Sequence, residues 1–283
     1  MKIKNPLVCA LVVGLVSAVG VSPLRAELPS MTEKESLGYF AILKTKDYQF
    51  GITSQGKATL KMVSKTGEVT TQKQTNIAVD FLVEETWPSG KVSQKAIVPE
   101  SLESSQAATD KPKDIVFRGK TKEGAGYEIF FTEDHGAVSL GGHMLPSEPP
   151  SKNPLRVVVR VRVPNAYPDT KDLNDKKVAK AFEQKTAKDR LTLIMTDGKR
   201  TKLSTTDSID AGSKEINGPG ITAAQLELSP YLGKKVELKA SENSTMALSN
   251  TAPAPLQDGF MISWSADAAK DPQAKARLTI DFK

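Results

Sequence analysis

The sequence predicts a mainly β protein made of two tandem duplicated units, each an N-terminal helix followed by a small antiparallel β-sandwich. Residues 34–59 recur without a gap 142 positions later as residues 176–201, with eight identities among 26 positions. Outside these segments, short stretches alternate apolar with polar residues and are separated by Gly, Pro, Asn and Asp, as in antiparallel sheets. The identical pairs are Lys34/Lys176, Phe40/Phe182, Lys46/Lys188, Asp47/Asp189, Ile52/Ile194, Gly56/Gly198, Lys57/Lys199 and Thr59/Thr201.

Residues 1–26 have the pattern of an export signal. Lys2 and Lys4 precede an apolar run at 7–21, and a small residue, Ala26, stands where cleavage is expected. Cleavage would remove the single cysteine, Cys9, and lower the net charge from +6 to +3 by removing three cations (6 − 3). We therefore expect a protein that is secreted, periplasmic or at the cell surface, with no disulfide and no integral membrane segment after signal removal. A charge of +3 gives no reason to expect a nucleic-acid partner.

Each unit is predicted to open with a capped helix of about 12–14 residues. Ser30 and Glu33 fit a capping box in the first unit, and Asp172 is the expected N-cap in the second. The aligned Phe40 and Phe182 are then expected to anchor the two helices in the core.

A hairpin should follow each helix. Strands at 48–53 and 57–63 flank Gly56, and strands at 191–195 and 200–204 flank Gly198. Glycine supplies the positive φ that such a tight turn needs, and Asp-Gly between apolar runs is a strong hairpin signal.

Further matches at an offset of 144 extend the duplication through the rest of each unit. They include an alternating strand at 77–84, and both units end in a strand, at 155–163 and at 276–282. The predicted organisation is a first unit at 28–163, a linker at 164–171 and a second unit at 172–283.

The segment 134–153 has no counterpart in the second unit and is predicted to be a loop. It contains His135 and His143, which lie near Glu133 and Asp134. Imidazole and carboxylate groups can bind divalent ions, but this spacing matches no short metal motif. We expect no metal and no other cofactor, and we keep both histidines as candidate ligand-binding residues.

Two short fragments, 133–137 and 209–213, carry Asp-x-Gly and resemble degenerate forms of the aspartic-peptidase motif. Ala211 and His135 stand where that family has a hydroxyl residue. The resemblance implies a secreted aspartic-type endopeptidase that acts on extracellular glycoprotein, with Asp134 and Asp210 as its catalytic carboxylates. Such a pair must lie close enough to share one proton.

Arg156, Arg160 and Arg162 alternate along one strand and form a basic stripe. The stripe is suited to bind a sulfated or sialylated glycan or another polyanion. The alternative, which we favour, is cross-strand pairing with Asp80 and Glu84 on a neighbouring strand.

Trp87 and Tyr231 occupy equivalent positions next to turns and are candidates for sugar stacking. Repeated aromatic residues at the corner of a sandwich more commonly pack in the core, and we expect that here. Trp264 alternates with Ile262 on one strand and is also expected in the core.

The function expected from these observations is that of an exported non-enzymatic β-sandwich protein that binds an extracellular or envelope protein or glycan. The first alternative is the peptidase described above, and the second is a structural component of the envelope.

Overall fold

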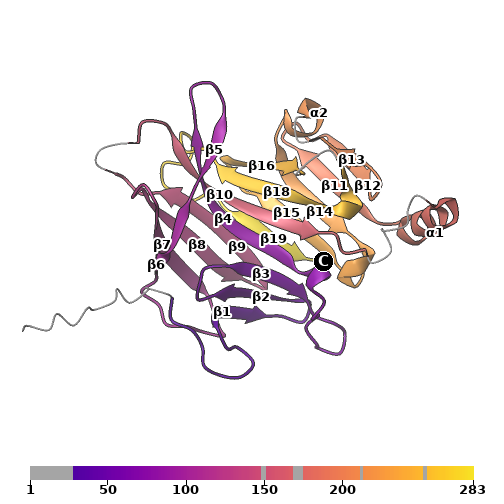
Figure 1. The fold of residues 1–283 in the computed structure, drawn as a ribbon, viewed down its shortest axis with the longest axis horizontal. Helices are drawn as coiled ribbons and strands as arrows, with labels where there is room; N and C mark the ends of the chain where they lie inside the picture. The colour runs from indigo at the N-terminus through magenta and orange to yellow at the C-terminus, as the bar shows by residue number, and fades with distance from the viewer. Residues whose placement is uncertain (1–27, 148–150, 168–174, 211–212, 251–253) are drawn as a thin grey trace, which may run out of the picture.

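The computed structural model describes residues 28–147, 151–167, 175–210, 213–250 and 254–283. The predicted signal peptide lies outside these residues. The described chain is mainly β, as predicted, and is built around one large curled antiparallel sheet with two short α-helices (Figure 1). Among the described residues, no helix has both the length and the apolar character needed to cross a membrane.

The strands follow one another along the chain with short connections. The strands of the first part are β1 (Tyr39–Lys44), β2 (Tyr48–Thr53), β3 (Ala58–Met62), β4 (Ile77–Thr86), β5 (Val92–Lys95), β6 (Ile97–Glu103), β7 (Asp114–Thr121), β8 (Gly126–Asp134), β9 (Ala137–Met144) and β10 (Leu155–Pro164). Those of the second part are β11 (Arg190–Met195), β12 (Arg200–Ser204), β13 (Ser208–Ile209), β14 (Ile221–Glu227), β15 (Lys235–Ala240), β16 (Ser244–Ser249), β17 (Ala254–Pro255), β18 (Gly259–Ala266) and β19 (Leu278–Phe282). The helices are α1 (Lys176–Thr186) and α2 (Lys214–Asn217).

The hydrogen-bonded pairings divide the curled sheet into two layers. One layer has the order β1-β2-β3-β4-β10-β18-β16, and the other has the order β6-β7-β8-β9-β19-β15-β14-β11-β12. At one end, β5 pairs with β4 and continues into β6 of the other layer. At the other end, a single residue pair joins β14 to β16. The sheet therefore folds back on itself and encloses the core between its two layers.

Aromatic contacts between the layers mark that core. Phe50 of β2 stacks on Phe131 of β8 at 5.6 Å between ring centroids. Tyr48 of β2 stacks on Phe282 of β19 at 4.2 Å. Each such buried aromatic contributes about 1.5–3 kcal/mol of burial free energy, so contacts of this kind hold the layers together.

The two predicted units share these layers instead of forming separate sandwiches. β10, at the end of the first predicted unit, pairs with β18 of the second along six residues. In the other layer, β9 pairs with β19. The expectation of one small sandwich in each unit therefore differs from the observed pairing, because strands from both units complete each layer.

The helix prediction is confirmed in the second unit and wrong in the first. In α1, Asp175 is the N-cap and accepts hydrogen bonds from the amides of Lys177 and Val178; the predicted cap Asp172 lies outside the described residues. Phe182 is buried, as predicted.

In the first unit, residues 33–38 form turns and the chain enters β1 at Tyr39. Ser36 bonds back to the carbonyl of Glu33, and Gly38 has φ +81°, which ends the turn. The β1 segment then pairs with β2 along its length. Phe40 still reaches the core, where it makes an edge contact with Phe117 at 5.3 Å. Tertiary pairing has overridden a local helical pattern here.

Both predicted hairpins are confirmed. The amide of Gly56 donates to the Thr53 carbonyl, and the amide of Gly198 donates to the Met195 carbonyl. The two glycines have φ values of +73° and +82°.

The predicted loop at 134–153 contains a full strand. β9 pairs with β8 on one side and β19 on the other. Val138 and Leu140 alternate into the core with no exposed surface, which is the pattern of a strand. Gly142 has a physical role there, because a Cβ at this position would lie 2.7 Å from the Glu128 carbonyl oxygen.

Candidate ligand-binding cavity

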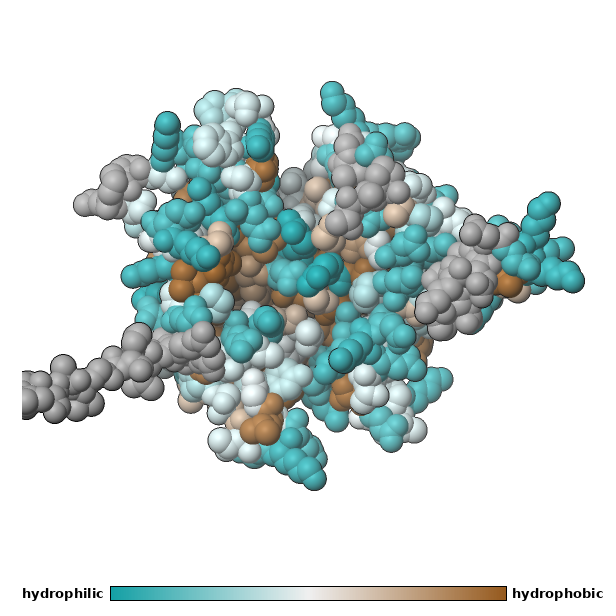
Figure 2. Space-filling model, viewed as in Figure 1, coloured by the Kyte–Doolittle hydropathy of each residue, from teal (hydrophilic) through white to brown (hydrophobic). Residues whose placement is uncertain are grey.

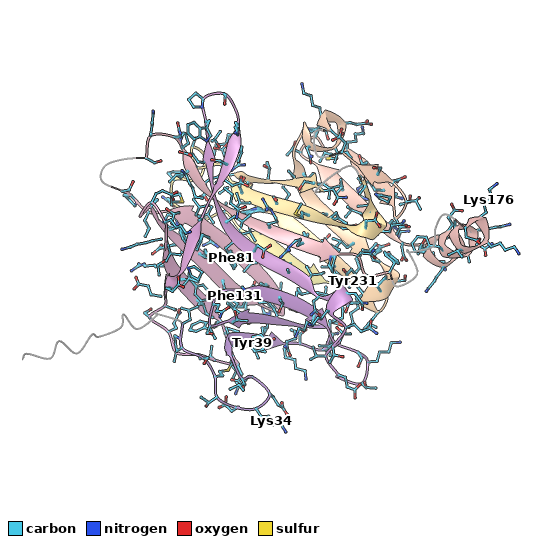
Figure 3. The ribbon with its side chains drawn as sticks, viewed as in Figure 1. Lys34, Tyr39, Phe81, Phe131, Lys176 and Tyr231 are labelled. Carbon is cyan, nitrogen blue, oxygen red and sulfur yellow. The ribbon has the colours of Figure 1, made fainter. Side chains whose placement is uncertain are left out.

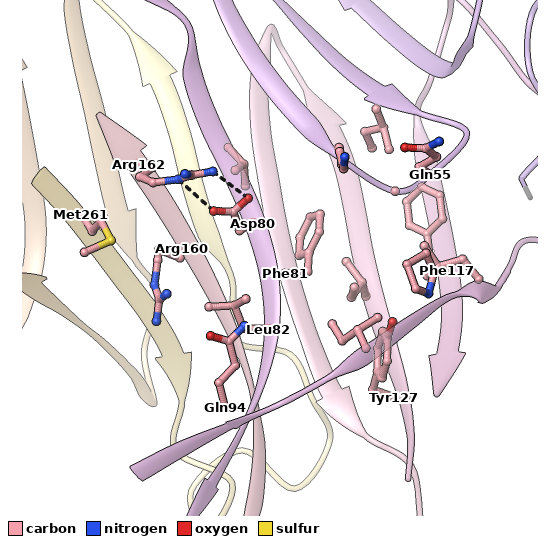
Figure 4. Close-up of a pocket in the computed structure, with 18 residues that line it drawn as sticks. Gln55, Asp80, Phe81, Leu82, Gln94, Phe117, Tyr127, Arg160, Arg162 and Met261 are labelled. Atoms are coloured by element: carbon pink, nitrogen blue, oxygen red, sulfur yellow. Dashed lines mark hydrogen bonds and ion pairs between the residues drawn. The ribbon is translucent and has the colours of Figure 1, made fainter. Parts of the chain in front are cut away.

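A cavity of about 610 Å³ opens beside β4, between the two layers of the curled sheet (Figure 4). In the space-filling view, hydrophobic surface lies at the bottom of a hollow near the place where Figure 3 labels Phe81 (Figures 2 and 3). The lining residues come from eight strands and one hairpin turn. They are Ile52, Gln55, Gly56, Lys57, Val79, Asp80, Phe81, Leu82, Gln94, Ile97, Pro99, Leu102, Phe117, Tyr127, Ile129, Arg160, Arg162 and Met261.

The walls of the cavity are mostly apolar. Phe81 on β4 is only partly buried, and it points toward the space lined by Phe117 of β7 and Tyr127 of β8 (Figure 4). Ile129 lies directly opposite Phe117 in the β7–β8 ladder, so both side chains emerge on the same face. An apolar ligand group placed here would lose its contact with water without requiring a polar partner.

The segment from β5 to β6 crosses the mouth of the cavity (Figure 4). It contributes Ile97, Pro99 and Leu102 to the lining. The β6–β7 register shifts between Val98 and Glu103, on either side of Pro99, which has no amide hydrogen to give to a ladder. Leu102 packs on the turn of the β2–β3 hairpin, where a Cβ on Gly56 would collide with the Leu102 Cδ1 atom.

One polar group is buried in the lining without a hydrogen bond. Tyr127 is 1% exposed, and its hydroxyl has no hydrogen-bond partner in the described structure. The ring lies across Gly119, its direct partner in the ladder, and a Cβ there would collide with the tyrosine hydroxyl. Burial raises the pKa of Tyr127 to about 12, so the hydroxyl remains protonated and able to donate at neutral pH.

The three arginines of the predicted stripe are paired, and two of them, Arg160 and Arg162, line one rim of the cavity. Arg156 donates to Glu84 at 2.9 Å, and Arg160 reaches the other oxygen of the same carboxylate at 3.4 Å. Arg162 lies 3.1 Å from Asp80 (Figure 4). This is the cross-strand pairing that the sequence favoured.

Lys57 occupies another part of the rim, in the β2–β3 turn. Its side chain is exposed, and its ammonium group makes no ion pair with any residue that the structure describes. Of the three cationic groups in the lining, Arg160 pairs with Glu84 and Arg162 pairs with Asp80, so the charge of Lys57 alone is not offset by a described ion pair. An anionic ligand group is therefore favoured at this rim over a cationic one.

The two histidines lie on the β8–β9 hairpin and line no part of this cavity. His135 is in the turn, with φ +49°, and its side chain is 96% exposed and 3.5 Å from Asp134. His143 stacks on Phe130 at 5.4 Å and lies 3.7 Å from Glu128. Within the part of the chain that the structure describes, no three His, Cys, Asp or Glu side chains are grouped to hold a metal ion.

The two carboxylates of the peptidase alternative are placed by different sheets. Asp134 ends β8 in the large sheet, and its side chain is 76% exposed. Asp210 directly follows β13, which pairs with β17 in a separate two-stranded sheet. Neither residue lines the cavity.

The aligned aromatics have opposite environments. Tyr231 is fully buried, as the favoured interpretation of core packing predicted, so its ring has no exposed face for sugar stacking. The expectation of core packing is wrong for Trp87, which is 43% exposed in the β4–β5 turn and whose indole donates to Ser93. Trp264 is fully buried, as predicted.

Comparison with known proteins finds a solved structure with a similar fold and identifies no family. No family model matches the chain, and no curated protein matches it. The alpha-N-acetylgalactosaminidase NagBb from Bifidobacterium bifidum, in complex with Gal-NHAc-DNJ, matches 86% of this chain with a TM-score of 0.52 and 9% identity. The GalNAc complex of the same protein matches 86% of this chain with a TM-score of 0.45 and 10% identity.

These matches cover only 36% and 35% of the NagBb chains, so this chain spans about a third of their length. At such low identity the likeness to the first complex concerns the fold alone.

Sequence reasoning did not find the cavity. Leu102 stands in the polar stretch 101–113, which has few apolar residues, yet it is buried and lines the cavity. One available signal was the alternation of Phe117 and Gly119 in β7 with Tyr127 and Ile129 in β8, which places these residues on one face. Their meeting with β4 depends on how the sheet curls, and no local pattern encodes that.

Proposed function

We propose that this chain is an exported non-enzymatic binding protein and that the cavity beside β4 holds the apolar part of its ligand. The observation that carries the proposal is the cavity itself. Its volume of about 610 Å³ falls within the range of small-molecule sites, and its walls are apolar with a few polar groups.

The lining also bears on the class of partner. The sequence led to an extracellular or envelope protein or a glycan. A bare glycan suits these walls poorly, because its hydroxyl groups would be desolvated against Phe81, Phe117 and Ile129 without partners. We therefore propose a small amphipathic molecule as the ligand. No observation of comparable weight favours the peptidase or the purely structural role.

The duplication concerns the origin of the chain, and it is compatible with this proposal. The two hairpins with the aligned glycines form in the same way. We infer that a helix-plus-β unit was duplicated and that strands of both copies later came to share each layer. Helix formation is retained in the second copy only.

The proposal is tested with the neutral apolar fluorophore N-phenylnaphthylamine, whose emission rises in an apolar site. Ile97→Trp should fill the cavity and abolish the saturable signal, because Ile97 lies in the lining and is only partly buried. Val92→Trp is the matched control, since Val92 is an exposed residue of β5 outside the lining.

The expected result is saturable binding to the wild type and to Val92→Trp, with at least about a tenfold loss in Ile97→Trp. Absence of saturable binding to the wild type, or equal binding to the two variants, would contradict the proposed cavity function.

A further inference from the structure

The Tyr127 hydroxyl is an unusual group in this cavity. A buried hydroxyl without a partner loses about 1–3 kcal/mol relative to its hydration in water. Tyr127 is one of two described tyrosines in this state, and the other, Tyr231, does not line this cavity. Gly119 leaves the space that the Tyr127 hydroxyl occupies. A ligand with an oxygen acceptor would satisfy this donor, and an entirely apolar ligand would not.

The charge at the mouth gives a second, independent indication. Asp80 and Glu84 pair with Arg162 and Arg160, but Lys57 has no ion pair within the described structure, so its positive charge at the mouth is not offset. Apolar walls, one buried donor and a cationic rim together fit a molecule with an apolar chain and an oxyanion end.

We propose that the ligand is an apolar-chain carboxylate or related oxyanion, that Tyr127 donates a hydrogen bond to its oxygen, and that Lys57 attracts its charge. This inference rests on the proposed function, because it concerns the same cavity. Tyr127 is thereby the residue that determines specificity, and Lys57 has the weaker role of an exposed charge.

The first experiment measures displacement of N-phenylnaphthylamine by decanoate and by decyltrimethylammonium, which share a chain length and differ in the sign of the head group. The concentration of decanoate that displaces half of the fluorophore should be at least about tenfold lower than that of decyltrimethylammonium. Equal potency of the two, or a preference for the cation, would overturn the proposed ligand class while leaving the apolar cavity intact.

The second experiment compares Tyr127→Phe with Tyr231→Phe. Both substitutions remove a buried hydroxyl that lacks a partner, but only the first does so in the cavity. Decanoate affinity should fall about tenfold or more in Tyr127→Phe and remain unchanged in Tyr231→Phe, because a hydrogen bond to a charged acceptor is lost in the first variant alone.

The fluorophore itself and the stability of the variants serve as controls. N-phenylnaphthylamine should bind Tyr127→Phe as well as the wild type, and the urea midpoint of neither Phe variant should fall, since no hydrogen bond is broken. Unchanged decanoate affinity in Tyr127→Phe would overturn the assigned role of the hydroxyl. If the fluorophore does not bind the wild type at all, the proposed function fails, and this inference with it.

The third experiment uses the duplication as its control. Lys57 and Lys199 occupy equivalent positions after the turn glycines, but only Lys57 lines the cavity. Lys57→Gln should weaken decanoate binding about threefold at low salt, and Lys199→Gln should leave it unchanged. An equal effect of the two substitutions would show that long-range charge, and not this rim, attracts the anion.

Discussion

The β2–β3 and β11–β12 hairpins have the same turn hydrogen bonds and different surroundings. In the first, a Cβ on Gly56 would meet Leu102, and the turn forms part of the cavity rim. In the second, a Cβ on Gly198 would have no neighbour within 4 Å. The repeated residues thus encode the turn, while the surrounding strands decide whether that turn takes part in a binding site.

The aligned aromatics Trp87 and Tyr231 should show the largest difference between the two halves. Tyr231→Ala is expected to cost about 3–5 kcal/mol of unfolding free energy, because a fully buried ring is removed and its hydroxyl makes no hydrogen bond that would be lost. Trp87→Ala should cost less than about 1 kcal/mol, since the indole is 43% exposed. Urea denaturation of both variants measures the difference. Equal losses would show that the two aligned positions have the same structural role.

Local patterns predicted much of this fold for a physical reason. The turn glycines, the alternating strand at Ile77–Thr86 and the buried Trp264 depend on residues close together in the chain. A positive φ, a period of two and a bulky apolar side chain on the inner face each have a direct sequence signal.

The predictions that were wrong concern segments whose structure depends on residues elsewhere in the sequence. The first predicted helix became β1 because pairing with β2 outweighed its helical pattern. The predicted loop became β9 because β8 and β19 lie on either side of it. The cavity requires β4, β6, β7 and β8 to meet around a space that they do not fill, and composition gives no signal for that. Pairing of the basic stripe was predictable because its acids lie on a neighbouring strand.

Lys95 and Lys239 lie 144 positions apart in the duplication, and each pairs with a buried glutamate. Lys95 lies 3.0 Å from Glu85, and Lys239 lies 3.2 Å from Glu237. Burial alone would raise the pKa of Glu237, but hydrogen bonds from Lys283, Gln225 and Lys239 outweigh it and lower the pKa to about 2.

This lowered pKa predicts how the stability of the protein depends on pH. A carboxylate whose folded pKa lies below its ordinary value of 4.5 stabilises the fold above that pH, and the contribution is lost as the pH falls toward about 2. Glu237→Gln should therefore lower the free energy of unfolding by up to about 3 kcal/mol at neutral pH. The loss should be smaller at about pH 3. Urea unfolding of the variant and the wild type at both pH values tests this. A loss that does not change with pH would show that the side chain acts through its shape and not through its charge.

The smallest expected loss of stability concerns the turn glycines of the two hairpins. Gly56→Ala and Gly198→Ala both place a Cβ at positive φ, which costs about 1–2 kcal/mol. Only Gly56→Ala also displaces the Leu102 side chain, and because this chain borders a cavity it has space to move, so we expect about 1 kcal/mol of additional loss. Urea midpoints measure the stabilities, and N-phenylnaphthylamine affinity, which should fall in Gly56→Ala alone, reports the cavity. If both variants lost stability equally and retained affinity, contact between the turn and Leu102 would not shape the site. The two hairpins would then be equivalent in energy as well as in backbone geometry.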